Sequence, residues 1–236
     1  MAVKRYLRYT HHPYYGFLLS IPLIIIYEAG IIYLHKYSSL IVRNLFDVVT
    51  KKMIVWVGGL GFFMISVALL LGVIFLLRPK KDMLLFHGWY FIALIMEATA
   101  YAMFYLGAMT HLGPYAMSSA TDYTSGFSGV ILSFGAGIYE ELMFRVVVFG
   151  LLMLIMHRIF GLRRFISFLF AASVSSVFFS LVHYWGNAAD TFTAYTFWFR
   201  FAGGMFFSII YFFRGFAASV YTHALYDVLI ALAVSV

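Results

Sequence analysis

Long apolar runs constrain the fold of this chain more than any other feature of its sequence. Each run approaches the ~20 residues that a helix needs to cross the hydrocarbon of a bilayer. Because every backbone polar group must be satisfied inside a bilayer, the sequence predicts an all-α, polytopic transmembrane helical bundle. Arg214 and Gly215 alone separate the last two runs, so six to eight spans fit the pattern. The most direct count is about seven spans: 17–34, 53–77, 88–112, 130–157, 166–186, 192–213 and 216–236.

The composition of the chain supports this prediction. Hydrophobic residues make up 64% and charged residues 11% of the chain, whereas a soluble domain is about half apolar and about a quarter charged. The net charge of +7 gathers between the apolar runs, as expected for loops that face an anionic leaflet. With the N terminus inside, ten Lys and Arg residues fall on the cytoplasmic side and four on the other. We therefore expect a multi-pass protein of a prokaryotic cytoplasmic membrane with a cytoplasmic N terminus.

Residues 35–52 differ from the long runs because basic and apolar residues are mixed in them at near-helical spacing. This pattern predicts an amphipathic helix that lies in the membrane interface. A helix that binds a partner protein is the alternative interpretation.

Ionisable side chains inside a predicted span cost about 2.5–3.5 kcal/mol each, even on lenient insertion scales. We expect Glu28 and Glu97 to be protonated, or bonded to tyrosine hydroxyls or to Arg200. Arg200 itself is expected to snorkel or to pack on aromatic rings, so a structural role suffices for these three residues. The remaining ionisable residues of the spans are Glu140, Glu141, Arg145, His183, His223 and Asp227.

The segment IYEELMFR concentrates three of these charges and ends at Arg145. On a helix Glu141 and Arg145 are one turn apart, in the order that favours an ion pair, so we predict that they neutralise each other. Glu140 lies about 100° round the helix from Glu141. The positions one turn after Glu140 are Met143 and Phe144. Its carboxylate is therefore predicted to point to a different part of the bundle.

Two histidines and an aspartate complete the set of unusual positions. His183 lies near the end of an apolar helix in FFSLVHYW, and His223 and Asp227 stand one turn apart in YTHALYD. Each has a structural alternative: a satisfied buried imidazole at His183, and a hydrogen bond by which Asp227 fixes the tautomer of His223. Together with Glu140, these side chains come from three neighbouring helices and can meet in one polar cavity.

A carboxylate and imidazoles in one cavity support two kinds of hydrolytic chemistry. In general-base catalysis they hold and deprotonate a water, while other polar groups stabilise the oxyanion. In metal-assisted hydrolysis they ligate a divalent cation such as zinc. The zincin motif H-E-x-x-H does not occur in the sequence, so the metal alternative lacks its most specific support.

In combination the three segments resemble the CPBP family of intramembrane proteases, that is, CAAX proteases and bacteriocin-processing enzymes, which includes the Rce1-type prenyl-protein endopeptidase. The resemblance covers about residues 130–231. It implies that residues 130–236 form a catalytic helical core, while residues 1–129 supply N-terminal transmembrane helices and the interfacial helix of one integral membrane domain. The matching motifs are Glu140-Glu141-x-x-x-Arg145, Phe179-x-x-x-His183 and His223-x-x-x-Asp227.

Carried over by position, the resemblance assigns a role to each motif residue. Glu140 is the general base that activates water, and His183 helps to hold that water. His223 and Asp227 stabilise the tetrahedral oxyanion. The remaining motif residues support the site by bracing or packing: Glu141, Arg145 and Phe179.

The sequence departs from the family pattern at two positions, and the two histidines lie at different predicted depths in the membrane. Asp227 stands where Asn is common, and an ionised Asp must be protonated, orient His223 or bind a metal, because it cannot donate to an oxyanion. Val146 stands where the family often has Gly, which alters local helix packing. Counted along the helices, His183 lies toward the outer end of its span and His223 toward the inner end. Helix tilt or an off-centre span boundary would close this gap of about 10–15 Å.

The resemblance favours a mechanism without a cofactor, because a metal-independent glutamate mechanism is associated with the family's better-understood members. The expected partners are the lipid bilayer and a membrane-associated protein or peptide substrate, and no nucleic acid. If a divalent metal such as zinc binds, its expected ligands are Glu140, His183, His223 and Asp227.

Two other functions remain open on the sequence. A non-catalytic accessory or immunity protein with the same fold would have no need of all the polar groups, so the intact motif set argues against it. A proton-coupled carrier would use the buried carboxylates as a relay. Carriers commonly have two related halves, and no such internal symmetry is visible.

Overall fold

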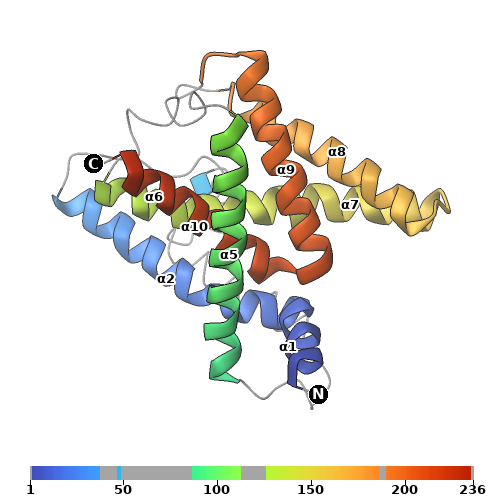
Figure 1. Ribbon diagram of the computed structural model, residues 1–236, viewed down its shortest axis with the longest axis horizontal. Coiled ribbons are helices and arrows are strands. Elements are labelled where there is room, and N and C mark those ends of the chain that lie inside the picture. Colours follow the sequence, from blue (N-terminus) through green and yellow to red (C-terminus); the bar gives the residue numbers. More distant parts are fainter. Residues whose placement is uncertain (1, 38–46, 49–86, 113–125, 186–189, 235–236) are drawn as a thin grey trace, which may run out of the picture.

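The computed structural model describes residues 2–37, 47–48, 87–112, 126–185 and 190–234 (Figure 1). Over these ranges the chain is helical apart from its short connections, which confirms the prediction of an all-α helical bundle. The predicted span at 53–77 lies outside the described residues. So does the predicted interfacial helix at 35–52, except for residues 35–37 and 47–48. The division of the chain at residues 129 and 130 stays a prediction.

Six helical segments in the described ranges are long and apolar enough to cross a membrane, which is the pattern of an integral, multi-pass membrane protein. Their bounds lie within four residues of those of six predicted spans. A shorter helix, α1 (Ala2–His11), precedes them. The spanning segments are α2 (Pro13–Tyr37), α5 (Gly88–Leu112), a continuous rod of α6 (Gly126–Glu141), η4 (Leu142–Phe149), α7 (Gly150–Leu154) and η5 (Ile155–Ile159), then α8 (Arg164–Val182), α9 (Ala194–Arg214) and α10 (Phe216–Val234).

The rod that begins with α6 contains two π-helical stretches, η4 and η5. Backbone hydrogen bonds in a π-helix reach five residues along the chain instead of four, and such stretches are frequent at functional sites. In Figure 1 the rod runs horizontally across the picture. η4 begins directly after Glu141, so the two adjacent carboxylates stand where the helical geometry changes.

Contacts between helix ends divide the bundle into two sides. The backbone N–H of His87 donates to the hydroxyl of Tyr15 at 3.1 Å, so α2 and α5 begin on the same side. The rings of Tyr33 and Phe127 lie 5.7 Å apart, which puts the end of α2 beside the start of α6 on the opposite side. The rod from α6 therefore ends on the first side, where α8 begins.

The turn between α9 and α10 also lies on the first side, against α1. Gly215 adopts a φ of +86° there, and a Cβ atom at this position would lie 2.9 Å from the Cα of His11. A glycine is thus required both by its backbone conformation and by the close approach of α1. We refer to this side as the basic end, because most of the cations beside the helix ends lie there: Lys4, Arg5, Arg8, Arg158, Arg163, Arg164 and Arg214. That this end faces the cytoplasm stays a prediction.

α10 occupies the centre of the bundle, in contact with α2, α5, α6 and α9. It approaches α6 closely because small residues face each other across the interface. A Cβ atom on Gly137 would lie 2.7 Å from the Cβ of Ala224 and 2.8 Å from the carbonyl oxygen of Val220. This close contact brings the end of α6, with its two carboxylates, alongside α10.

The carboxylate of Glu97 on α5 is bound by side chains from α1, α9 and α5 itself. It accepts hydrogen bonds from the hydroxyls of Tyr6 at 2.5 Å and Tyr101 at 2.9 Å. The guanidinium of Arg214 approaches the same carboxylate at 2.5 and 2.7 Å. The tyrosine partners agree with expectation, but the arginine is Arg214 and not Arg200. Arg214 ends α9 at the basic end near Glu97, whereas Arg200 lies toward the other end of the same helix.

The other two isolated charges also have local partners. Arg200 pairs with Asp190, and its guanidinium lies 5.3 Å from the ring centre of Tyr184, which agrees with the predicted aromatic packing. Glu28 is buried on α2 and accepts a hydrogen bond from the hydroxyl of Tyr139 at 3.2 Å. A structural role therefore accounts for both residues.

Candidate active site

Polar side chains from three parts of the fold gather in the bundle between the rod, α8 and α10. The junction of α6 and η4 supplies two carboxylates and an arginine, the end of α8 supplies a histidine, and one face of α10 supplies a serine, a histidine and an aspartate. We refer to them as the central polar cluster: Glu140, Glu141, Arg145, His183, Ser219, His223 and Asp227.

Glu141 is fully buried and contacts three other residues of this cluster. One of its carboxylate oxygens is 3.2 Å from Nε of Arg145, which confirms the ion pair predicted from their spacing. The same oxygen accepts a hydrogen bond from the hydroxyl of Ser219, and the other oxygen lies 2.9 Å from Nδ1 of His223. A single carboxylate thus joins η4 to two successive turns of α10.

Arg145 is fully buried between two aromatic rings. Its guanidinium carbon lies 5.0 Å from the ring centre of Phe179 and 5.6 Å from that of Phe207. Its Nη2 also donates to the carbonyl oxygen of Gly204 at 3.4 Å. The aromatic faces and the carboxylate of Glu141 supply negative potential around the buried guanidinium.

His223 presents its two ring nitrogens to different carboxylates. Nδ1 faces Glu141, while Nε2 lies 4.0 Å from Oε2 of Glu140 and 3.4 Å from Oδ2 of Asp227. The ring stacks on Phe207, with 4.5 Å between centroids and 14° between planes. The imidazole is therefore fixed on one face and at Nδ1, and Nε2 is left toward Glu140 and Asp227.

The contact at Nδ1 adds a partner that the sequence did not indicate. A hydrogen bond between Asp227 and His223 was one interpretation of this pair, because the two residues share a face of α10. In the folded protein Asp227 lies beside Nε2, and Glu141 from the neighbouring helix takes Nδ1. The spacing within α10 brings His223 and Asp227 together. The packing of α6 on α10 decides which ring nitrogen of His223 each carboxylate contacts.

His183 lies directly after the last residue of α8, a little earlier in the chain than the predicted helix end at 186. Its Nδ1 is 2.7 Å from the carbonyl oxygen of Phe179, so Nδ1–H donates to the backbone and Nε2 is available as an acceptor.

Phe179 links the two histidines that the sequence placed at different depths. Its ring centroid lies 5.1 Å from that of His183 and 6.0 Å from that of His223. It also packs against the ring of Phe144 at 5.2 Å and against the guanidinium of Arg145. These contacts place the Phe179 ring between the two imidazoles. That His183 and His223 reach the same water stays a prediction.

Two residues of the site were missed by sequence reasoning. Ser219 precedes His223 by one helical turn, so the shared face of α10 was a usable signal for a polar partner. Phe207 is one of 27 phenylalanines in the chain, and nothing in its local sequence marks it out. Its position against both His223 and Arg145 emerges only from the packing of α9.

Within the described ranges, no group of three or more His, Asp or Glu side chains has an arrangement that would hold a cation. Nδ1 of His223 faces Glu141, and Nδ1 of His183 donates to the backbone, so Nε2 is the remaining nitrogen of each ring. A mechanism without a metal stays a prediction.

Residues 123–229 match the family model described as type II CAAX prenyl endopeptidase, Rce1-like. This range contains every residue of the central polar cluster. Neither the curated proteins nor the solved structures contain a match to the chain.

Proposed function

We propose, from the premise that residues 123–229 are a domain of the Rce1-like type II CAAX prenyl endopeptidases, that this chain is an intramembrane endopeptidase. Its substrate would be a membrane-anchored, lipidated or otherwise hydrophobic peptide segment. The observation that supports this most strongly is the separation of 4.0 Å between Oε2 of Glu140 and Nε2 of His223. A base and a potential oxyanion donor thus face each other inside an apolar bundle.

Glu140 acts as the general base in this proposal. Its carboxylate takes a proton from a water molecule, and Nε2 of His183 accepts a hydrogen bond that holds the same water. The oxygen of the water then attacks the carbonyl carbon of the scissile peptide bond, and the captured proton passes to the leaving amine. Positioned proton transfer of this kind contributes about 10²–10⁴-fold to a rate.

His223 stabilises the oxyanion that forms during the attack. With a proton on each nitrogen, Nδ1–H is held by Glu141 and Nε2–H points to the reacting oxygen. Asp227, 3.4 Å from Nε2, orients the ring before substrate arrives. A fixed donor of this type is worth about 10²–10³-fold in turnover. Arg145 and Ser219 act through Glu141, because both contact that carboxylate.

Cleavage of a lipidated peptide tests the proposed function. The full-length protein is reconstituted in liposomes and offered a farnesylated peptide with a three-residue tail after the modified cysteine, and the same peptide without the lipid. Mass spectrometry is expected to detect release of the tail from the lipidated peptide and little or none from its unmodified twin. Protein carrying Glu140→Gln is the blank. Absence of cleavage of the lipidated peptide by the wild-type protein, or equal cleavage by the blank, would contradict the proposal.

Metal removal tests the mechanism separately. Because the described donors do not assemble a ligand set, proteolysis is expected to continue at its full rate after treatment with EDTA or 1,10-phenanthroline. The metal content of the purified protein is measured in the same samples. Activity that is lost on chelation and restored by added zinc would replace the glutamate mechanism with a metal-assisted one.

A further inference from the structure

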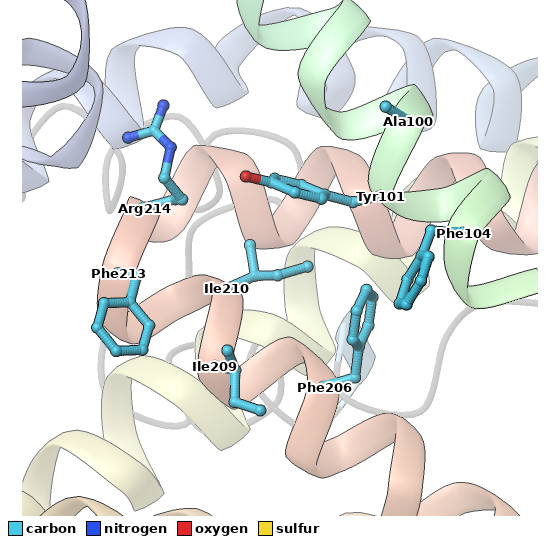
Figure 2. Close-up of a pocket in the computed structure, with 8 residues that line it drawn as sticks. All are labelled: Ala100, Tyr101, Phe104, Phe206, Ile209, Ile210, Phe213 and Arg214. Carbon is cyan, nitrogen blue, oxygen red and sulfur yellow. The ribbon is translucent and has the colours of Figure 1, made fainter. Parts of the chain in front are cut away.

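A groove runs between α5 and α9 on the outer surface of the bundle, with a volume of about 560 Å³. Figure 2 shows its walls, which are mostly apolar side chains. Phe104 and Phe213 are 68% and 64% exposed, so the groove opens toward the surroundings of the bundle. In a spanning segment those surroundings are hydrocarbon.

The groove is separate from the central polar cluster. Phe206 lines the groove, whereas the next residue, Phe207, stacks on His223. Successive residues of a helix point about 100° apart, so α9 stands between the groove and the cluster. A ligand in the groove therefore does not lie where the peptide bond would be cleaved.

One end of the groove is polar and adjoins α1. Arg214 lines this end, and its guanidinium lies 5.3 Å from the ring centre of Tyr6. Its Nη2 also donates to Thr10 Oγ1 at 3.2 Å, and both partners belong to α1. α1 therefore lies beside the basic end of the groove, where α9 turns into α10.

The outer face of α1 carries three exposed cations: Lys4, Arg5 and Arg8. Within the described ranges none of the three forms an ion pair with an acidic side chain. Val3 and Leu7 on the flank of the helix are 67% and 40% exposed, so α1 is both basic and apolar on its outer surface. A helix of this kind lies in the interface of an anionic membrane, where headgroups meet the cations.

We propose that the groove and α1 together bind one anionic phospholipid. Its headgroup lies against Lys4, Arg5 and Arg8, and one of its acyl chains fills the groove past Arg214 toward Phe206. The apolar groove fits a hydrocarbon chain, and the cations of α1 fit a negatively charged group. A phospholipid carries both in one molecule. The occupant thus has the charge opposite to that of the surface and arrives from the leaflet that the basic end faces. This inference does not depend on the proposed proteolysis.

The stability of the full-length protein in an uncharged detergent tests the proposal. Added phosphatidylglycerol is expected to raise the thermal midpoint by about 3 °C or more, because a ligand of the native state stabilises it. Phosphatidylcholine with the same acyl chains is expected to leave the midpoint nearly unchanged. Native mass spectrometry of the same samples is expected to retain one phosphatidylglycerol per chain.

Two variants examine the two halves of the site. Lys4→Gln with Arg5→Gln and Arg8→Gln removes the headgroup contacts, and Ala100→Trp fills the groove; each is expected to abolish the rise. The matched controls are Lys36→Gln, an exposed cation at the other end of the bundle, and Met103→Trp, an exposed position of α5 outside the groove. Both controls are expected to keep the wild-type response.

Three results would overturn the proposal. The first is an equal rise of the thermal midpoint with phosphatidylcholine, which would show that the charge of the lipid plays no role. The second is a phosphatidylglycerol response that survives in both variants. The third is a dimer that Ala100→Trp dissociates, because the groove would then hold a second protein chain and not a lipid.

Discussion

Replacement of Glu140 by Gln is expected to lower cleavage of the lipidated peptide by about 10³-fold or more, because the substitution removes the general base. An amide has nearly the shape of a carboxylate and still forms hydrogen bonds, but it does not accept the proton of the attacking water. Glu140 is 8% exposed and lies 4.0 Å from His223, so the neutral side chain keeps its place in the cluster. The measurement is the initial rate of tail release by protein in liposomes.

The matched control for this variant is Glu28→Gln. Glu28 is also a buried glutamate, and it is bound by Tyr139, the residue directly before Glu140. Its substitution is expected to leave the rate within a few fold of wild type, because the amide oxygen still accepts the tyrosine hydroxyl. Full activity of Glu140→Gln would exclude Glu140 as the base. Full complementation of a deletion strain by Glu140→Ala would favour a non-catalytic accessory role.

Replacement of Glu141 by Ala is expected to destabilise the protein by about 3–5 kcal/mol, because it leaves a buried arginine without its counter-charge. Arg145 and Glu141 are both fully buried, so solvent does not screen the loss. The same change removes the hydrogen bonds to Ser219 and to Nδ1 of His223. Unfolding in mixed micelles, followed by loss of helical signal, measures the effect.

A double variant separates the structural from the positioning role of Glu141. Glu141→Leu with Arg145→Met replaces the ion pair with apolar side chains of similar volume, which is often neutral or stabilising for a buried pair. We expect it to recover most of the stability but not the activity, since the ring of His223 loses its anchor. Recovery of both would show that Glu141 only neutralises Arg145. Recovery of neither would place its role in the packing of α6 on α10.

Sequence alone gave a good account of the helices, because the length and apolarity of a span are set by the bilayer and can be counted along the chain. The ends were less certain: α8 ends at Val182, four residues before the predicted end. A helix end depends on local turns, such as the one that begins at His183, which hydropathy does not register.

The central polar cluster was predictable where its contacts are local. The ion pair of Glu141 and Arg145 follows from their spacing on one helix, as does the proximity of His223 to Asp227. The contact between Glu141 and His223 spans 82 positions in the chain and depends on the close approach of α6 and α10 at Gly137. No spacing rule reports such a contact, so the sequence did not predict that Glu141 is the partner of Nδ1.

The π-helical stretch η4 affects how the length of this chain can vary. Since its hydrogen bonds reach five residues along the chain, it contains one residue more than an α-helical segment with the same bonding would need. Loss of one residue from its exposed side, such as Val147, would return the backbone to α-helical bonding. The bulge absorbs the difference of one residue, so the residues that follow keep nearly the same orientation about the helix axis, and Glu140 and Glu141 before it stay against α10. Insertions and deletions of single residues in relatives are therefore expected to gather in η4, where they leave the carboxylates and the following helix faces in place.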